Sequence, residues 1–185
     1  MAIISFWSNS KRETGQTLSS VAVATAMAID HNHKILEVAT SFQDNTIENC
    51  FWDESKAKNV RAITGVTQIN FNNGVEGLIK IIQSNRSSSN IVGDYARVVF
   101  KDRLDVLPAP ATQNIIDYNT IAGYYPDLLK IADREYDMVF VDVDKRMPMD
   151  TQRKILEQSD VVVLTLKQGL DAMKNVINLR SNDEL

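Results

Sequence analysis

Apolar residues fall into continuous runs along this chain, and longer stretches with a helical spacing of apolar positions separate the runs. Continuous runs, unlike strict alternation, indicate strands that are buried on both faces, as in parallel sheets. The runs are residues 2–7, 35–39, 138–143 and 161–166, and the helical stretches are 17–29, 75–82, 119–136, 150–158 and 170–179. Strand and helix therefore alternate, which predicts an α/β fold with a mostly parallel sheet and helices on both faces.

Two shorter apolar runs, residues 97–100 and 104–107, flank a charged turn. They predict a hairpin, or a strand that follows a turn, and Pro108 and Pro110 end the second run. The polar stretch 84–93 is typical of an exposed connection within a domain. We expect a single domain over residues 1–185.

In parallel sheets, ligands bind beyond the carboxyl ends of the strands. The loop after the first run is polar and ends at Gly15-Gln16-Thr17, where a helix is predicted to begin. A strand, a polar loop and a helix that opens on Gly-x-Thr form the context of a phosphate-binding P-loop, G-x-x-x-x-G-K-[ST]. The match is partial, because Ser10 replaces the first glycine and Gln16 replaces the lysine. A polar loop that caps a helix is the alternative.

Residues 5–28 resemble the deviant Walker A loop of the ParA/MinD family, K-G-G-x-G-K-[ST], with Lys11, Gly15 and Thr17 at matching positions. Three later stretches are similar to family strands and follow in the family's order: 104–109, which ends in Leu-Pro-Ala, 136–142 and 159–165. The resemblance implies a P-loop NTPase-like three-layer sandwich that binds ATP and Mg²⁺. It also implies a face-to-face homodimer in which Lys11 reaches the partner's phosphates. The implied nucleotide-binding residues are Lys11, Thr14, Gly15, Gln16, Thr17 and Leu18, and the implied magnesium-binding residues are Thr17 and Asp142.

Several positions depart from the family pattern. Two glycines, the phosphate-binding lysine, a second hydroxyl, both aspartates of a D-x-D-P-Q motif and its proline are replaced. The residues at these positions are Arg12, Glu13, Gln16, Leu18, Ala39, Ser41 and Phe42. A lost lysine–phosphate contact forfeits about 1.5–3 kcal/mol, and a left-handed Arg12 or Glu13 costs roughly 1–2 kcal/mol. A loss of about 4 kcal/mol is about a thousandfold in affinity, so micromolar nucleotide binding becomes millimolar.

These losses favour nucleotide binding with weak or no hydrolysis, because phosphoryl transfer depends on positioning and charge stabilisation. We expect a localisation, assembly or partitioning switch that acts through dimerisation and a protein partner. An interaction module on the same fold, without nucleotide, is the alternative. A third hypothesis is a receiver-like signalling domain, since residues 142–150 resemble a phosphoacceptor loop whose spacing is too long.

Charge and composition narrow the possible partners. The chain has 20 basic and 24 acidic residues and a net charge of −4, with no basic stripe, which disfavours direct nucleic-acid binding. No apolar run approaches the ~18–20 residues of a membrane span, and no basic leader precedes the first run. We therefore predict a cytoplasmic protein without membrane insertion. The single Cys50 excludes an internal disulfide.

Glycine is scarce, with seven residues in the chain, and Ser10, Arg12 and Glu13 stand at three of the family's glycine positions. Three smaller expectations concern other polar sites. His31 and His33 are expected in a solvated turn, Met147 and Met149 in an exposed loop, and Asp144 beside Asp142 as a second possible magnesium ligand. Family members continue after the helix at 170–179, so the resemblance also implies that this chain lacks their C-terminal elements.

Overall fold

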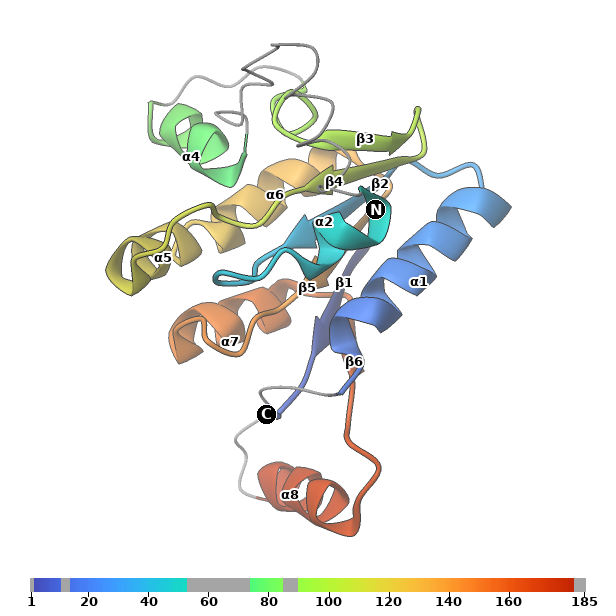
Figure 1. Cartoon of the computed structure of the whole chain (residues 1–185), viewed down its shortest axis with the longest axis vertical. Helices are drawn as coiled ribbons and strands as arrows, with labels where there is room; N and C mark the ends of the chain where they lie inside the picture. Colours follow the sequence, from blue (N-terminus) through green and yellow to red (C-terminus); the bar gives the residue numbers. More distant parts are fainter. Residues whose placement is uncertain (1, 11–13, 53–73, 85–89, 182–185) are drawn as a thin grey trace, which may run out of the picture.

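The computed structural model describes residues 2–10, 14–52, 74–84 and 90–181. Its centre is a six-stranded sheet with the strand order β3-β4-β2-β5-β1-β6 (Figure 1). Neighbouring strands are parallel, apart from the antiparallel pair of β3 and β4. The strands are β1 (Ala2–Trp7), β2 (Ile35–Ala39), β3 (Arg97–Phe100), β4 (Leu104–Leu107), β5 (Met138–Asp142) and β6 (Val161–Leu164).

Helices cover both faces of this sheet, so the molecule has the three layers that the sequence predicts (Figure 1). On one face lie α1 and α2, and on the other lie α4, α5, α6 and α7. Helix α8 follows β6 and lies apart from the other helices. The helices are α1 (Gln16–Asp30), α2 (Thr46–Phe51), α4 (Val75–Gln83), α5 (Ile115–Ala122), α6 (Tyr125–Glu135), α7 (Met149–Gln158) and α8 (Leu170–Ser181).

Alternate residues of each strand enter opposite halves of the core. From β2, Leu36 and Val38 face the α4–α7 layer, and Ile35 faces α1. The small side chains of Ala24 and Ala28 are buried where α1 packs on the sheet. These alanines let the backbone of α1 approach the sheet closely, which fixes the position of the loop before the helix.

The register of the sheet sets the carboxyl edge where a ligand would bind. Asp142, the last residue of β5, pairs with Phe6 of β1 on one side and with Ala39 of β2 on the other. The loop after β1, the end of β5 and the loop after β2 are therefore neighbours, although they are far apart in the sequence.

The predicted fold class and the hairpin of β3 and β4 are confirmed. The single helix predicted for 119–136 is wrong, because two helices, α5 and α6, meet at Gly123. Pro126 lies in the first turn of α6, where its missing N–H costs nothing. This proline was the overlooked signal. Several element ends differ from the prediction by one or two residues. For example, α1 begins at Gln16 instead of Thr17, β5 ends at Asp142 instead of Val143, and β6 ends at Leu164 instead of Leu166.

The loop predicted for Met147 and Met149 is only half right. Met149 is 70% exposed, but Met147 is 2% exposed and belongs to the core between the sheet and α7. The predicted loop at 84–93 is described only in part: residue 84 caps α4, residues 90–93 form turns, and residues 85–89 lie outside the described ranges.

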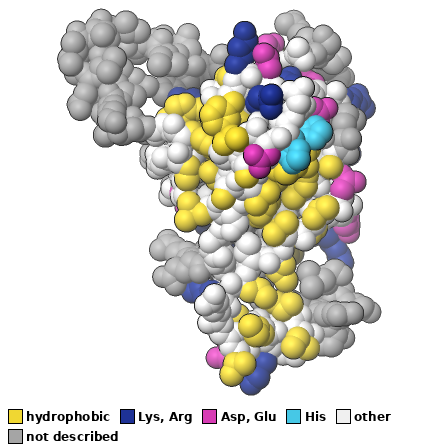
Figure 2. Space-filling view, turned by 90° about the vertical axis from the view of Figure 1, so that its right-hand side faces the viewer, with side chains coloured by type: hydrophobic (Ala, Val, Ile, Leu, Met, Phe, Trp, Pro, Cys, Tyr) yellow, Lys and Arg dark blue, Asp and Glu magenta, His cyan; other side chains and the backbone are white. Residues whose placement is uncertain are grey.

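The outer side of α1 is apolar. No charged residue occurs between Gln16 and Ile29, and Leu18, Val23 and Ile29 are exposed. Figure 2 shows hydrophobic side chains down this side of the molecule, from below the two histidines towards α8, where Leu170, Met173 and Ile177 are exposed. We call this surface the α1 face. Helices that are apolar all round are usually covered.

Among the described residues, no helix has the length and apolarity needed to cross a membrane.

Candidate functional site

The candidate site begins at the junction between the loop after β1 and helix α1. Gly15 precedes the helix with a φ of 74°, a left-handed conformation that side chains with a Cβ rarely adopt. Its carbonyl accepts the first helical hydrogen bond, from the Ser19 N–H at 2.8 Å. The free N–H groups of such a helix start favour an anion.

The first two side chains of α1 turn inward, toward the end of β5. The Gln16 amide donates from Nε2 to Asp142 Oδ1 at 2.7 Å and to the Val143 carbonyl at 2.9 Å. The Thr17 hydroxyl donates to Asp142 Oδ2 at 2.8 Å. Both oxygens of this carboxylate, which is 6% exposed, therefore accept hydrogen bonds from the protein.

Burial raises the pKa of Asp142, and the hydrogen bonds from Thr17 and Gln16 oppose this rise by favouring the charged form. The neighbouring carboxylate of Asp144 also raises the pKa of Asp142. Thr17 and Gln16 thus supply the stabilisation that a buried carboxylate otherwise needs from a cation.

Hydrogen bonds join the loop after β2 to the end of β5. The buried Thr40 hydroxyl donates to the Asp142 carbonyl at 2.7 Å and accepts from the Asp144 N–H at 2.8 Å. Asp144 in turn accepts from the Phe42 N–H at 2.7 Å and pairs with the Arg146 guanidinium at 2.6 Å. The carboxylate of Asp144 is thus bound to Arg146 and Phe42, although the sequence suggested it as a magnesium ligand.

The structure brings together only part of the predicted nucleotide site. Gln16 and Thr17, which follow Gly15, bond to Asp142, and the Thr14 hydroxyl accepts from Thr165 after β6 at 3.3 Å. Leu18 is 60% exposed and has no polar atom to offer. Lys11, which was predicted to bind nucleotide, lies outside the described residues, as do Arg12 and Glu13, which replace two family glycines.

The described residues do not fit a magnesium ion as they are arranged. A hydroxyl and a carboxylate are suitable ligands, but a cation would have to compete with Thr17 and the Gln16 amide, which each donate a hydrogen bond to one oxygen of Asp142. No group of three or more His, Cys, Asp or Glu residues in the described ranges could hold a metal ion. The histidines form an exposed turn, with His31 and His33 ring centroids 5.9 Å apart.

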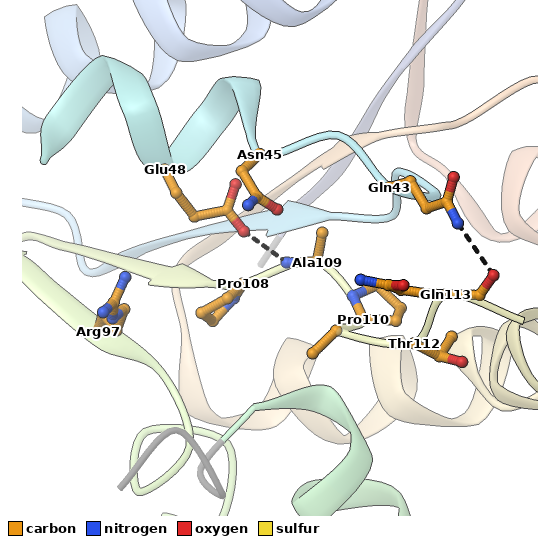
Figure 3. A pocket seen from close by; sticks show the side chains of 10 residues that line it. Gln43, Asn45, Glu48, Arg97, Pro108, Ala109, Pro110, Thr112 and Gln113 are labelled. Carbon is orange, nitrogen blue, oxygen red and sulfur yellow. Dashed lines mark hydrogen bonds between the residues drawn. The ribbon is translucent and has the colours of Figure 1, made fainter. Parts of the chain in front are cut away.

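A pocket of about 550 Å³ opens at the ends of β2 and β4, and sequence reasoning missed it (Figure 3). Gln43 Nε2 donates to the Gln113 carbonyl at 2.9 Å, and the Glu48 carboxylate accepts from the Ala109 N–H at 2.8 Å. Gln43 has a φ of 54°, and strained residues of this kind cluster at functional sites. Pro108 and Pro110 line the pocket. From the sequence, both were interpreted as strand breakers, and Pro108 also as part of a Leu-Pro-Ala turn similar to that of the family, but neither as part of a pocket.

The strand order excludes a receiver domain. In receiver-type sheets, the first strand lies between the second and third strands. Here β1 lies between β5 and β6. The receiver hypothesis for residues 142–150 is therefore wrong.

Neither a protein-family model nor a curated protein matches the chain. Solved structures do match it. The ParA-family ATPase of Chlorobium tepidum TLS matches 100% of this chain and 68% of its own length, with a TM-score of 0.70 and 18% identity. A putative plasmid partition protein of Borrelia burgdorferi B31, bound to AMPPNP, matches 98% of this chain and 69% of its own, with a TM-score of 0.64 and 18% identity.

The septum site-determining protein MinD of Pyrococcus horikoshii OT3, complexed with Mg-ADP, matches 98% of this chain and 65% of its own length. The TM-score is 0.58 and the identity 14%. The chain thus spans about two-thirds of the length of these structures. At such identities the likeness establishes the fold.

Proposed function

We propose that this chain, which has the ParA/MinD-like P-loop fold, binds the phosphates of a nucleotide weakly at Gly15–Thr17 and does not hydrolyse the nucleotide efficiently. The observation that carries this proposal is the direction of Gln16. Its amide donates inward to Asp142 and Val143, whereas a lysine at this position would bring a positive charge to the phosphates. ATP is the nucleotide that the fold resemblance favours.

Weak binding follows from what the site retains. The left-handed Gly15 and the start of a fifteen-residue helix offer backbone N–H groups to an anion. No lysine stands at position 16 to add charge. Backbone donors and the helix dipole alone support the millimolar range expected from the sequence.

Poor hydrolysis follows from the loop after β2. Ala39 is buried and has no group to orient a water molecule, and the Ser41 hydroxyl bonds to the Asp44 carbonyl. Asp144 holds Arg146 and the Phe42 N–H. These residues supply no carboxylate at the two positions where the family motif has aspartates, so positioned attack on a phosphate lacks its main support.

The proposal includes a dimer and a protein partner, in the cytoplasm. Leu18, Ile116 and Met149 are exposed apolar residues in the first turns of α1, α5 and α7. These helices follow β1, β4 and β5, so they begin at the same carboxyl edge of the sheet as the candidate site. The proposed face-to-face arrangement, in which nucleotide and partner bind at this edge, would cover these side chains.

Titration with ATP tests the proposal. We expect saturable thermal stabilisation of the wild type at millimolar ATP, and its loss in Thr17→Ala, because the hydroxyl holds Asp142 beside the helix start. Thr120→Ala is the matched control, since Thr120 bonds only within α5 in the described contacts. No stabilisation at several millimolar ATP would contradict the proposal.

A second candidate function is an interaction module that binds no nucleotide. The pocket at Gln43, Pro108 and Pro110 favours it, because prolines and the Gln43–Gln113 hydrogen bond hold its wall in place without a ligand. A preorganised pocket binds with less loss of entropy. Absence of ATP stabilisation in a folded protein is the result that would favour this function.

A further inference from the structure

Both N–H groups of the Gln16 side chain donate hydrogen bonds to the end of β5 and the residue that follows it. A glutamine amide has two N–H donors, and one points to Asp142 Oδ1 while the other points to the Val143 carbonyl. With the Thr17 hydroxyl on Oδ2, three hydrogen bonds fasten the first turn of α1 to β5. The amide nitrogen itself has no lone pair available for a metal ion.

We infer that Gln16 closes Asp142 to divalent cations, so that the site binds its phosphate ligand without magnesium. The inference rests on the proposed nucleotide site and states that binding there does not depend on a metal ion. Exclusion of the cation by Gln16 is a property of the ligand-free protein and can be tested without nucleotide.

The Gln16 amide and a divalent cation compete for the single carboxylate of Asp142. A cation, or a water molecule held by a cation, must reach a carboxylate oxygen of Asp142. That carboxylate is almost fully buried, and the Gln16 amide lies 2.7 Å from Oδ1. Hydrogen bonds to a charged group contribute about 1.5–3 kcal/mol, which corresponds to a disadvantage of about ten- to a hundredfold for a competing cation.

Neighbouring residues do not restore a cation site. The Asp144 carboxylate accepts hydrogen bonds from the backbone N–H and the guanidinium of Arg146, the shortest at 2.6 Å, and from the Phe42 N–H at 2.7 Å. The Arg146 guanidinium also offsets the negative charge of Asp144 through their ion pair. The Thr17 hydroxyl is an oxygen ligand at the candidate metal position, but its proton is directed at Asp142.

The test uses Mn²⁺ as a paramagnetic probe on the ligand-free protein. In the wild type, millimolar Mn²⁺ should leave the backbone amide NMR signals of Gly15, Thr17 and Asp142 unbroadened. In Gln16→Ala, the same signals should broaden, with apparent Mn²⁺ affinity higher by about tenfold or more. Gln113→Ala, a glutamine at the separate pocket, is the matched control and should behave like the wild type. Gln16→Met keeps the side-chain length without the donors and serves if the alanine variant fails to fold.

Broadening of these signals in the wild type would overturn the inference. Equal absence of broadening in both Gln16 variants would also overturn it, since the amide would then not be what excludes the cation. A second arm compares ATP affinity in magnesium and in EDTA. The wild type should show the same affinity in both, and Gln16→Ala should prefer magnesium. If neither protein binds ATP, the proposed function fails, while the Mn²⁺ result still decides the role of Gln16.

Discussion

A Glu37→Gln variant is expected to be more stable than the wild type above neutral pH, by about 4 kcal/mol at pH 8. Glu37 lies in β2, fully buried on the face that α1 covers. Its Oε1 accepts a hydrogen bond from the Ser20 hydroxyl at 2.6 Å, and its Oε2 has no partner among the described residues. Burial raises the pKa of Glu37 to about 8, and the Ser20 hydrogen bond opposes the rise.

The direction of the pH dependence follows from proton uptake. The unfolded chain releases the Glu37 proton near pH 4.5, whereas the folded protein keeps it until about pH 8. Between these values the folded state binds more protons, so the free energy of unfolding falls as the pH rises. Below pH 4.5 Glu37 is protonated in both states, so it no longer makes the free energy of unfolding depend on pH. Glutamine is neutral throughout and resembles the protonated carboxyl in shape.

Chemical denaturation of both proteins from pH 4 to pH 9 measures this difference. The two free energies of unfolding should be similar at the acid end and diverge steadily toward pH 8. Glu157→Gln, at an exposed position on α7, is the control and should change stability by only a few tenths of a kcal/mol. Parallel curves for wild type and Glu37→Gln would show that Glu37 ionises normally in the folded protein.

Replacing Thr40 by valine is expected to lower the free energy of unfolding by about 2–3 kcal/mol. Valine matches threonine in shape but removes the hydroxyl that donates to the Asp142 carbonyl and accepts from the Asp144 N–H. Two sheltered backbone groups then lose a partner, and each such loss costs roughly 1–3 kcal/mol. The variant also removes the Thr40 link between the loop after β2 and the end of β5, whereas the Phe42–Asp144 hydrogen bond remains.

Urea denaturation of Thr40→Val and Thr40→Ser separates hydroxyl loss from changed packing. Serine keeps the hydroxyl and should retain most of the stability that valine loses. Unchanged stability in Thr40→Val would contradict the prediction, and an equal loss in Thr40→Ser would show that the methyl group contributes as much as the hydroxyl does. Hydrogen exchange at the Asp144 N–H gives a local readout, and we expect faster exchange in Thr40→Val only.

Much of the fold could be predicted because it depends on local patterns. The apolar run at 35–39 contains Glu37 yet still forms a buried parallel strand, since four of its five residues are apolar. The hairpin of β3 and β4 and the helix after Gly15 were equally visible. The division of 119–136 at Gly123 was missed because the apolar spacing continues through Pro126, and a proline is tolerated in a first turn.

The candidate site, like the fold, could be predicted from the sequence only where it depends on local residues. From the sequence alone came the loop of residues 8–17, the glutamine in place of a lysine, and the missing carboxylates at Ala39 and Ser41. These are statements about which chemical groups are present. The pocket at Gln43 was not visible, because its walls come from loops after β2 and β4 that meet only in the folded sheet.

The sequence by itself determined an α/β protein whose first loop resembles a P-loop and has Gln16 where the family pattern has lysine. Only the tertiary structure decided where the remaining groups point. The sheet register places Asp142 between β1 and β2, and α1 then brings Gln16 within 2.7 Å of it across 126 residues of sequence. Burial, in the same way, raises the pKa of Glu37. Such contacts depend on the packing of segments that are distant in the chain, and neither periodicity nor residue type specifies them.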